Sequence, residues 1–196
     1  MLPWQSRGPA FFDTNENIKR GLKKSMSYSI DLSGKVAVVT GSSRGLGRAI
    51  ARSLADAGAK TVITSRTLKS LEPVQKELED SGHDVLSVEL DVRSHESIQA
   101  MAKKALGHFG QVDILVNNAG ICPMVPWEET TLENWNQLLS VNLTSAFLCS
   151  QAVLPYMREK KYGRLIHISS VGAFIGSVTG HVAYGVSKAG IIALSK

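Results

Sequence analysis

The chain has 196 residues, of which 43% are hydrophobic, enough to build one domain with a buried core. Its formal net charge is +5, but residues 1–30 carry +3 of that charge, so the remainder is nearly balanced and the charge does not indicate nucleic-acid binding. The two cysteines form no metal-binding or disulfide pattern and suit a reducing compartment, which predicts a cytoplasmic protein without a metal. No apolar run reads as long enough to cross a membrane.

Residues 1–30 show neither a helical nor a strand period and contain prolines and glycines. They also lack the apolar segment of a secretory signal. We therefore expect an N-terminal extension, disordered and outside the fold, followed by a nucleotide-binding domain over residues 31–196.

From residue 36 onwards, short β-branched runs alternate with helical patterns. Ser70 and Ser94 are predicted to cap two of the helices. Alternating strands and helices imply right-handed crossovers and a parallel sheet covered on both faces, an α/β/α Rossmann-type, doubly wound fold. In such sheets ligands bind outside the carboxyl ends of the strands. The predicted strands cover 36–39, 61–65, 85–90, 112–116 and 164–168, and the predicted helices cover 46–57, 70–79, 94–107, 132–160 and a segment from about 182.

The glycine-rich turn at residues 40–47, Thr-Gly-Ser-Ser-Arg-Gly-Leu-Gly, joins the first strand to the first helix. Gly41 permits an unusual backbone geometry, and Gly47 lets the helix lie close to the strand. This arrangement brings backbone N–H groups to a phosphate. The alternative is the Gly-x-Ser-x-Gly nucleophile elbow of α/β-hydrolases, but that elbow needs several strands before it, and at most one precedes this turn. A phosphate-binding turn is therefore favoured.

Taken with Asn117–Gly120, Asn142, Ser170 and Tyr184-x3-Lys188, this turn makes the chain over residues 31–196 resemble the short-chain dehydrogenase/reductase family, and within it the 3-oxoacyl-thioester reductases. The resemblance implies an NAD(P)-dependent oxidoreductase that interconverts a small-molecule ketone and a secondary alcohol. It also implies full-length relatives that form dimers or tetramers.

The catalytic roles follow from residue chemistry and from the resemblance together. Tyr184 and Lys188 lie one helical turn apart, so both project from one face. A nearby ammonium favours the phenolate, which suits Tyr184 to exchange a proton with the substrate oxygen. Ser170 would hydrogen-bond the same oxygen, so Ser170 and Tyr184 would contact the substrate. The resemblance implies that Asn142 holds a water in the proton path behind Lys188.

The residues after the second strand indicate the cofactor. An acidic residue there would bind the ribose hydroxyls of NAD, but Ser65 and Arg66 stand in its place, and Arg44 lies in the glycine turn. Two guanidinium groups suit a 2′-phosphate, which predicts NADPH over NADH. The predicted cofactor-binding residues are Gly41, Ser42, Ser43, Arg44, Gly45, Leu46, Gly47, Ser65, Arg66, Asp91, Val92, Asn118, Ala119, Gly120, Tyr184 and Lys188.

The resemblance also implies further strands and a substrate-covering lid after the helix of Tyr184, whereas the sequence stops at Lys196. The expected fold therefore lacks its C-terminal strands. An alternative reading is a truncated, catalytically inactive nucleotide-binding or interaction protein. His167 and His181 are interpreted as structural or loop residues, and Trp127 and Trp135 as packing residues.

Overall fold

The computed structural model describes residues 30–175 and 182–196, so the extension predicted for residues 1–30, apart from Ile30, and His181 lie outside the described residues. Within them a single sheet of parallel strands has the order β3-β2-β1-β4-β5, which confirms the predicted sheet. Its strands are β1 (Val36–Val39), β2 (Lys60–Ser65), β3 (Val85–Glu89), β4 (Ile114–Asn117) and β5 (Arg164–His167).

The helical elements alternate with these strands along the chain. They are α2 (Gly45–Asp56), the 3-10 turn η1 (Leu68–Ser70), α3 (Glu72–Asp80), α4 (His95–Phe109), the 3-10 turn η2 (Trp127–Glu129), α5 (Leu132–Leu139), the π-helical turn η3 (Ser140–Thr144), α6 (Ser145–Glu159), α7 (Gly172–Ile175) and α8 (Val182–Leu194).

Two apolar layers lie on opposite faces of the sheet because successive side chains of a strand point to opposite sides. Val36 and Val38 pack with the buried faces of α4 and α6. Ala37 and Val39 pack with the buried faces of α2 and α3. The result is the predicted three-layer α/β/α arrangement.

The chain reverses its direction of travel across the sheet at β1. It winds outward from β1 to β2 and β3, and then returns to place β4 and β5 on the other side of β1. In parallel sheets with such a reversal, ligands bind in a crevice at the carboxyl ends of the strands beside it.

Two predicted helix boundaries differ from the structure. Ser70 does not cap α3; its hydroxyl donates to the carbonyl of Thr67 at 2.8 Å inside the preceding 3-10 turn, and α3 begins at Glu72. Helix α4 continues past Gly107 to Phe109 and is capped by Gly110, which has a left-handed φ of 75°. The Ser94 cap is confirmed, since its side chain accepts from the amide of Ser97 at 3.1 Å.

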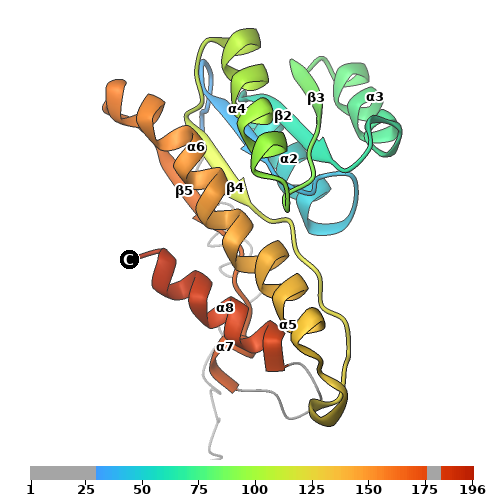
Figure 1. Cartoon of the computed structure of the whole chain (residues 1–196). Coiled ribbons are helices and arrows are strands. Elements are labelled where there is room, and N and C mark those ends of the chain that lie inside the picture. The colour runs from blue at the N-terminus through green and yellow to red at the C-terminus, as the bar shows by residue number, and fades with distance from the viewer. Residues whose placement is uncertain (1–29, 176–181) are drawn as a thin grey trace, which may run out of the picture. The chain divides into compact units, whose positions relative to one another are not determined.

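Elements α5, η3 and α6 form one continuous helix of 28 residues beside β4 and β5, with α7 and α8 near the α5 end (Figure 1). This helix is long and apolar enough to cross a membrane by length and composition, so the sequence-based statement that no run is long enough was wrong. Half of its most apolar window is buried inside the protein, as in a core helix. The buried side chains of α6 include Cys149, Val153 and Met157, which pack on the sheet.

Candidate active site

The turn between β1 and α2 brings its backbone unusually close to the end of β4. Gly41 and Gly45 have φ values of 65° and 57°, a region that side chains disfavour. A Cβ at Gly47 would lie 2.5 Å from Nδ2 of Asn118, and closer still to the carbonyl oxygen of Gly41. The turn therefore excludes side chains at these points. Helix α2 begins here without an acidic residue in its first turn, so its N-terminal N–H groups suit an anion.

Thr40 and Asn118 join the glycine turn to the loop after β4. Oγ1 of Thr40 accepts from the amides of Asn118 at 2.9 Å and Ala119 at 3.0 Å. Nδ2 of Asn118 donates to the carbonyls of Thr40 at 2.8 Å and Gly41 at 3.0 Å. These bonds satisfy backbone groups of both loops, so the two loops are held as one unit.

A cleft of about 910 Å³ lies over this unit, at the carboxyl ends of the strands. It is lined by the predicted residues Gly41, Ser43, Arg44, Gly45, Leu46, Gly47, Ser65, Arg66, Asp91, Val92, Asn118, Ala119 and Gly120. It is also lined by residues that were not predicted to bind the cofactor, namely Thr67, Ser70, Leu90, Arg93, Ile121, Gln137 and Val141.

Ser42 was predicted to bind the cofactor, but it does not line the cleft. Its side chain is fully buried, and its Oγ accepts from the amide of Thr64 at 2.7 Å and donates to the carbonyl of Val39 at 3.1 Å. The hydroxyl therefore joins β1 to β2. Among the predicted residues of this turn, Ser43 rather than Ser42 faces the cleft.

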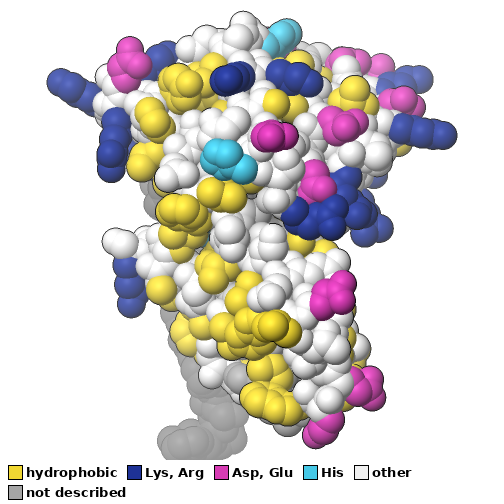
Figure 2. Space-filling view, in the orientation of Figure 1, with side chains coloured by type: hydrophobic (Ala, Val, Ile, Leu, Met, Phe, Trp, Pro, Cys, Tyr) yellow, Lys and Arg dark blue, Asp and Glu magenta, His cyan; other side chains and the backbone are white. Residues whose placement is uncertain are grey.

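The lining of the cleft is strongly basic. Arg44 and Arg66 are exposed and form no ion pair among the described residues, whereas Arg93 binds both carboxylate oxygens of Asp91, at 3.0 and 2.7 Å. These bonds, chiefly the side-chain bond from Arg93, lower the pKa of Asp91 to about 2. Figure 2 shows Lys and Arg side chains clustered beside an acidic one on this face of the molecule. The only carboxylate lining the described cleft is thus neutralised, and two arginines remain available to an anion.

Asn142 lies in the π-helical turn η3 and is almost completely buried. Its Oδ1 accepts from the amide of Ile121 at 2.8 Å, and its Nδ2 donates to the carbonyl of the same residue at 2.8 Å. Its Nδ2 also reaches Oγ of Ser187 in α8 at 3.3 Å. One side chain thereby fixes the loop after β4 against α8. Single π-helical turns are frequent at functional sites.

Lys188 is buried in α8, and its Nζ donates to the carbonyl of Ile168, just after β5, at 2.7 Å. Nζ lies 5.6 Å from the centre of the Tyr184 ring. Burial lowers the pKa of Lys188 from its ordinary value, and the neighbouring Cys122 opposes that shift. Ser170 and Tyr184 flank Gly172: a Cβ built there would lie 3.6 Å from Oγ of Ser170 and from Cε1 of Tyr184. The structure thus brings Ser170, Tyr184 and Lys188 together.

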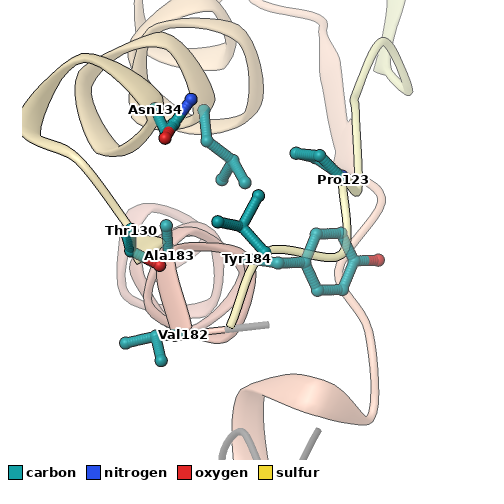
Figure 3. A pocket seen from close by; sticks show the side chains of 8 residues that line it. Pro123, Thr130, Asn134, Val182, Ala183 and Tyr184 are labelled. Carbon is teal, nitrogen blue, oxygen red and sulfur yellow. The ribbon is translucent and has the colours of Figure 1, made fainter. Parts of the chain in front are cut away.

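A small cavity of about 20 Å³ lies against the Tyr184 ring, between the loop after β4, α5 and the start of α8. Figure 3 shows Pro123 next to the ring, with Thr130 and Ala183 on the side away from the hydroxyl. Trp127 does not pack here; it is 68% exposed, so its prediction as a packing residue was wrong. Trp135 is half-buried.

Comparisons with known proteins identify the family. The chain is 40% identical over 113 residues to acetoacetyl-CoA reductase of an Acinetobacter species, and 42% identical over 107 residues to 3-oxoacyl-(acyl-carrier-protein) reductase FabG of Vibrio cholerae. These matches cover 58% and 55% of this chain and 45% and 43% of the relatives, so the aligned part spans less than half the length of each relative.

Solved structures show the same likeness. A metagenomic short-chain oxidoreductase in complex with NADP superposes with a TM-score of 0.79 at 39% identity, over 83% of this chain and 74% of that one. The structure of gox2181 superposes with a TM-score of 0.82 at 35% identity, over 85% of this chain and 65% of that one. The short chain dehydrogenase profile matches residues 35–196. The chain therefore belongs to the short chain dehydrogenase family.

Proposed function

We propose that this chain binds NADP(H) and interconverts a ketone and a secondary alcohol, with Tyr184, Ser170, Lys188 and Asn142 as its catalytic residues. The observation that carries the proposal is the buried ammonium of Lys188 beside the Tyr184 ring, with Ser170 across Gly172, next to a cleft that fits a dinucleotide. When bound, the nicotinamide supplies the hydride. The glycine turn and the N-terminus of α2 would hold the cofactor's diphosphate, while Asn118 keeps the turn in place through its bonds to Thr40 and Gly41.

Tyr184, Ser170 and Lys188 have separate roles in the proposed proton transfer. Tyr184 gives its hydroxyl proton to the carbonyl oxygen during reduction, and Ser170 donates a hydrogen bond to the same oxygen. Lys188 stabilises the phenolate that remains, because its ammonium is held near the ring by Ile168. A lysine ammonium has three donors, so one bond to Ile168 leaves two for a ribose hydroxyl or a water.

Replacing the phenol tests the chemistry. Tyr184→Phe should lower kcat for ketone reduction by about 10²–10⁴-fold, since it removes the acid, and leave the Kd for NADPH within about twofold. Tyr156→Phe, an exposed position on α6, is the matched control and should behave as wild type. If no ketone is reduced by the wild type although NADPH binds tightly, the chain is a nucleotide-binding protein and the catalytic proposal is wrong.

The preference for NADPH rests on Arg44 and Arg66. Both line the cleft, and neither is paired with a carboxylate among the described residues. Arg66→Asp should reverse the ratio of kcat/KM for NADPH to that for NADH, because a carboxylate repels the 2′-phosphate and accepts from ribose hydroxyls. Arg158→Asp, on the exposed side of α6, controls for the change in net charge. An unchanged ratio in Arg66→Asp would show that this arginine does not read the phosphate.

A further inference from the structure

Asn117, Ser150 and His167 form a hydrogen-bonded group of side chains to which the proposed reaction assigns no role. Asn117 ends β4, His167 ends β5, and the two residues are partners in the sheet register. Nδ2 of Asn117 lies 3.1 Å from Oγ of Ser150 in α6 and 3.2 Å from Nδ1 of His167. The hydroxyl of Ser150 donates to the carbonyl of Ala146 at 2.7 Å.

Counting hydrogens fixes the state of the imidazole. The single hydroxyl hydrogen of Ser150 goes to Ala146, so Oγ can only accept from Asn117, and the NH₂ group of that amide must face it. The other hydrogen of this NH₂ group points at Nδ1 of His167, which must therefore be an acceptor. The state that satisfies all of these bonds is a neutral ring with its proton on Nε2. Burial favours the same state, because it lowers the pKa of His167.

The residue after His167 connects this group to the candidate active site. The amide of Ile168 donates to the carbonyl of Asn117 at 3.0 Å, and the carbonyl of Ile168 accepts from Nζ of Lys188 at 2.7 Å. Ser169 then donates through its hydroxyl to the carbonyl of Lys188 at 2.9 Å. The end of β5 is thus the support on which the lysine is held, and the backbone bond from Ile168 and the side-chain bond from Asn117 to His167 together fix that end to β4.

We propose that neutral His167 is a positioning residue for Lys188, and that protonation of His167 at Nδ1 releases the end of β5 and with it the carbonyl that holds the lysine. The proposal rests on the catalytic role proposed for Lys188. Protonation would place two hydrogen-bond donors, Nδ1–H of His167 and the NH₂ group of Asn117, opposite each other with no acceptor between them. The groups that face the ring are uncharged, Asn117 from β4 and, through it, Ser150 from α6, and no charged side chain among the described residues contributes to its pKa shift.

Three variants separate positioning from folding. His167→Leu removes the acceptor, and we expect kcat/KM for ketone reduction with NADPH to fall about tenfold at pH 7.5, since Lys188 is displaced. His167→Asn retains an acceptor oxygen but cannot be protonated near neutral pH, so it should restore kcat/KM at pH 7.5 and abolish the loss of activity below the His167 pKa. His95→Asn, at the exposed start of α4, is the control and should follow the wild-type pH profile.

A second readout needs no turnover. In ¹H–¹⁵N spectra of the wild type, the amides of Ile168, Ser169 and Ser170 should shift with the imidazole titration, and these shifts should be absent in His167→Asn. The imidazole itself should carry its proton on Nε2 at pH 7.5. The proposal is overturned if these amides ignore the titration, if Nδ1 carries the proton, or if His167→Asn keeps the acid loss of activity. A wild type that reduces no ketone while its amides follow the imidazole would contradict the proposed function and leave the coupling of His167 to β5 intact.

Discussion

The proposed nucleotide-binding end of this site, made of the glycine turn and the loop after β4, is built differently from the proposed catalytic end, which holds Asn142, Ser170, Tyr184 and Lys188. At the nucleotide-binding end, backbones lie so close together that a Cβ at Gly47 has no room, and paired bonds from Thr40 and Asn118 hold two loops as one unit. At the catalytic end, individual side chains hold the geometry: Lys188 binds the carbonyl of Ile168, and Asn142 binds both the amide and the carbonyl of Ile121. Substitutions that add side-chain atoms should therefore do most damage at the nucleotide-binding end. Substitutions that remove side-chain atoms should do most damage at the catalytic end.

The largest loss of stability and of NADPH binding should come from adding side-chain atoms at Gly47. Gly47→Val forces α2 away from Gly41 and Asn118, so we expect the free energy of unfolding to fall by about 3 kcal/mol and NADPH binding to become undetectable. Denaturant unfolding and nicotinamide fluorescence measure the two effects. Gly107→Ala in α4 is the control, because its Cβ meets nothing within 4 Å, and it should be neutral or stabilising. Normal NADPH binding by Gly47→Val would contradict the close approach.

The second-largest loss of stability and activity should come from removing the side-chain amide of Asn142. Asn142→Ala leaves the amide and carbonyl of Ile121 without their buried partner, which should cost about 2 kcal/mol of unfolding free energy. The loop after β4 would then shift, so kcat/KM should fall by about a hundredfold. Asn136→Ala, exposed on α5, should change neither quantity. Equal unfolding free energies for the two variants would show that the Ile121 bonds do not stabilise the fold.

Adjacent serines in the glycine turn offer a sharper contrast. Ser42→Ala removes the acceptor of the buried Thr64 amide, so it should cost about 1–2 kcal/mol of unfolding free energy and alter NADPH affinity little. Ser43 faces the cleft, so Ser43→Ala should leave the unfolding free energy unchanged and raise the Kd for NADPH. Thermal unfolding and NADPH titration of both variants test the assignment, and identical behaviour would refute it.

The smallest expected effect concerns the two cysteine thiols, and it changes only the rate at which they are chemically modified. Burial raises the pKa of Cys149 to about 12, whereas Cys122 is exposed on the loop that follows β4. Ellman's reagent should modify one thiol quickly in the folded chain and both in denaturant. NADPH should slow the fast reaction, because the neighbouring Ile121 lines the cleft. The Cys122→Ser variant should lose the fast phase, and its persistence there would contradict the assignment.

The sequence was informative wherever local pattern and tertiary structure agree. Short β-branched runs correctly predicted the strands, since both faces of a parallel sheet are buried. The glycine turn was predictable because positive φ values and close backbone approach both demand glycine. Most residues predicted to bind the cofactor line one cleft for the same reason: they follow strands whose carboxyl ends share one edge.

The features that the sequence did not predict depend on partners that are distant in the chain or on competing local turns. Ser42 turns inward because Thr64 of β2 binds it, which the turn sequence alone does not indicate. Ser70 could have capped α3, but its hydroxyl is used within a 3-10 turn instead. Arg93 reaches the cleft through its pairing with Asp91 two residues earlier. His167 was interpreted as an ordinary structural residue because the sequence shows no acidic or thiol partner for it, whereas its partner in the structure is Asn117 on β4.

The π-helical turn between α5 and α6 makes the residue count of this long helix critical. An α-helix advances about 100° per residue, so deleting one residue within Ser140–Thr144 would rotate everything that precedes the turn by about that angle relative to α6. Asn142 could then no longer face Ile121 while Cys149 and Val153 keep their places against the sheet. A substitution within this helix changes the contacts of one side chain, whereas a change in its length would separate the loop after β4 from the core in a single step.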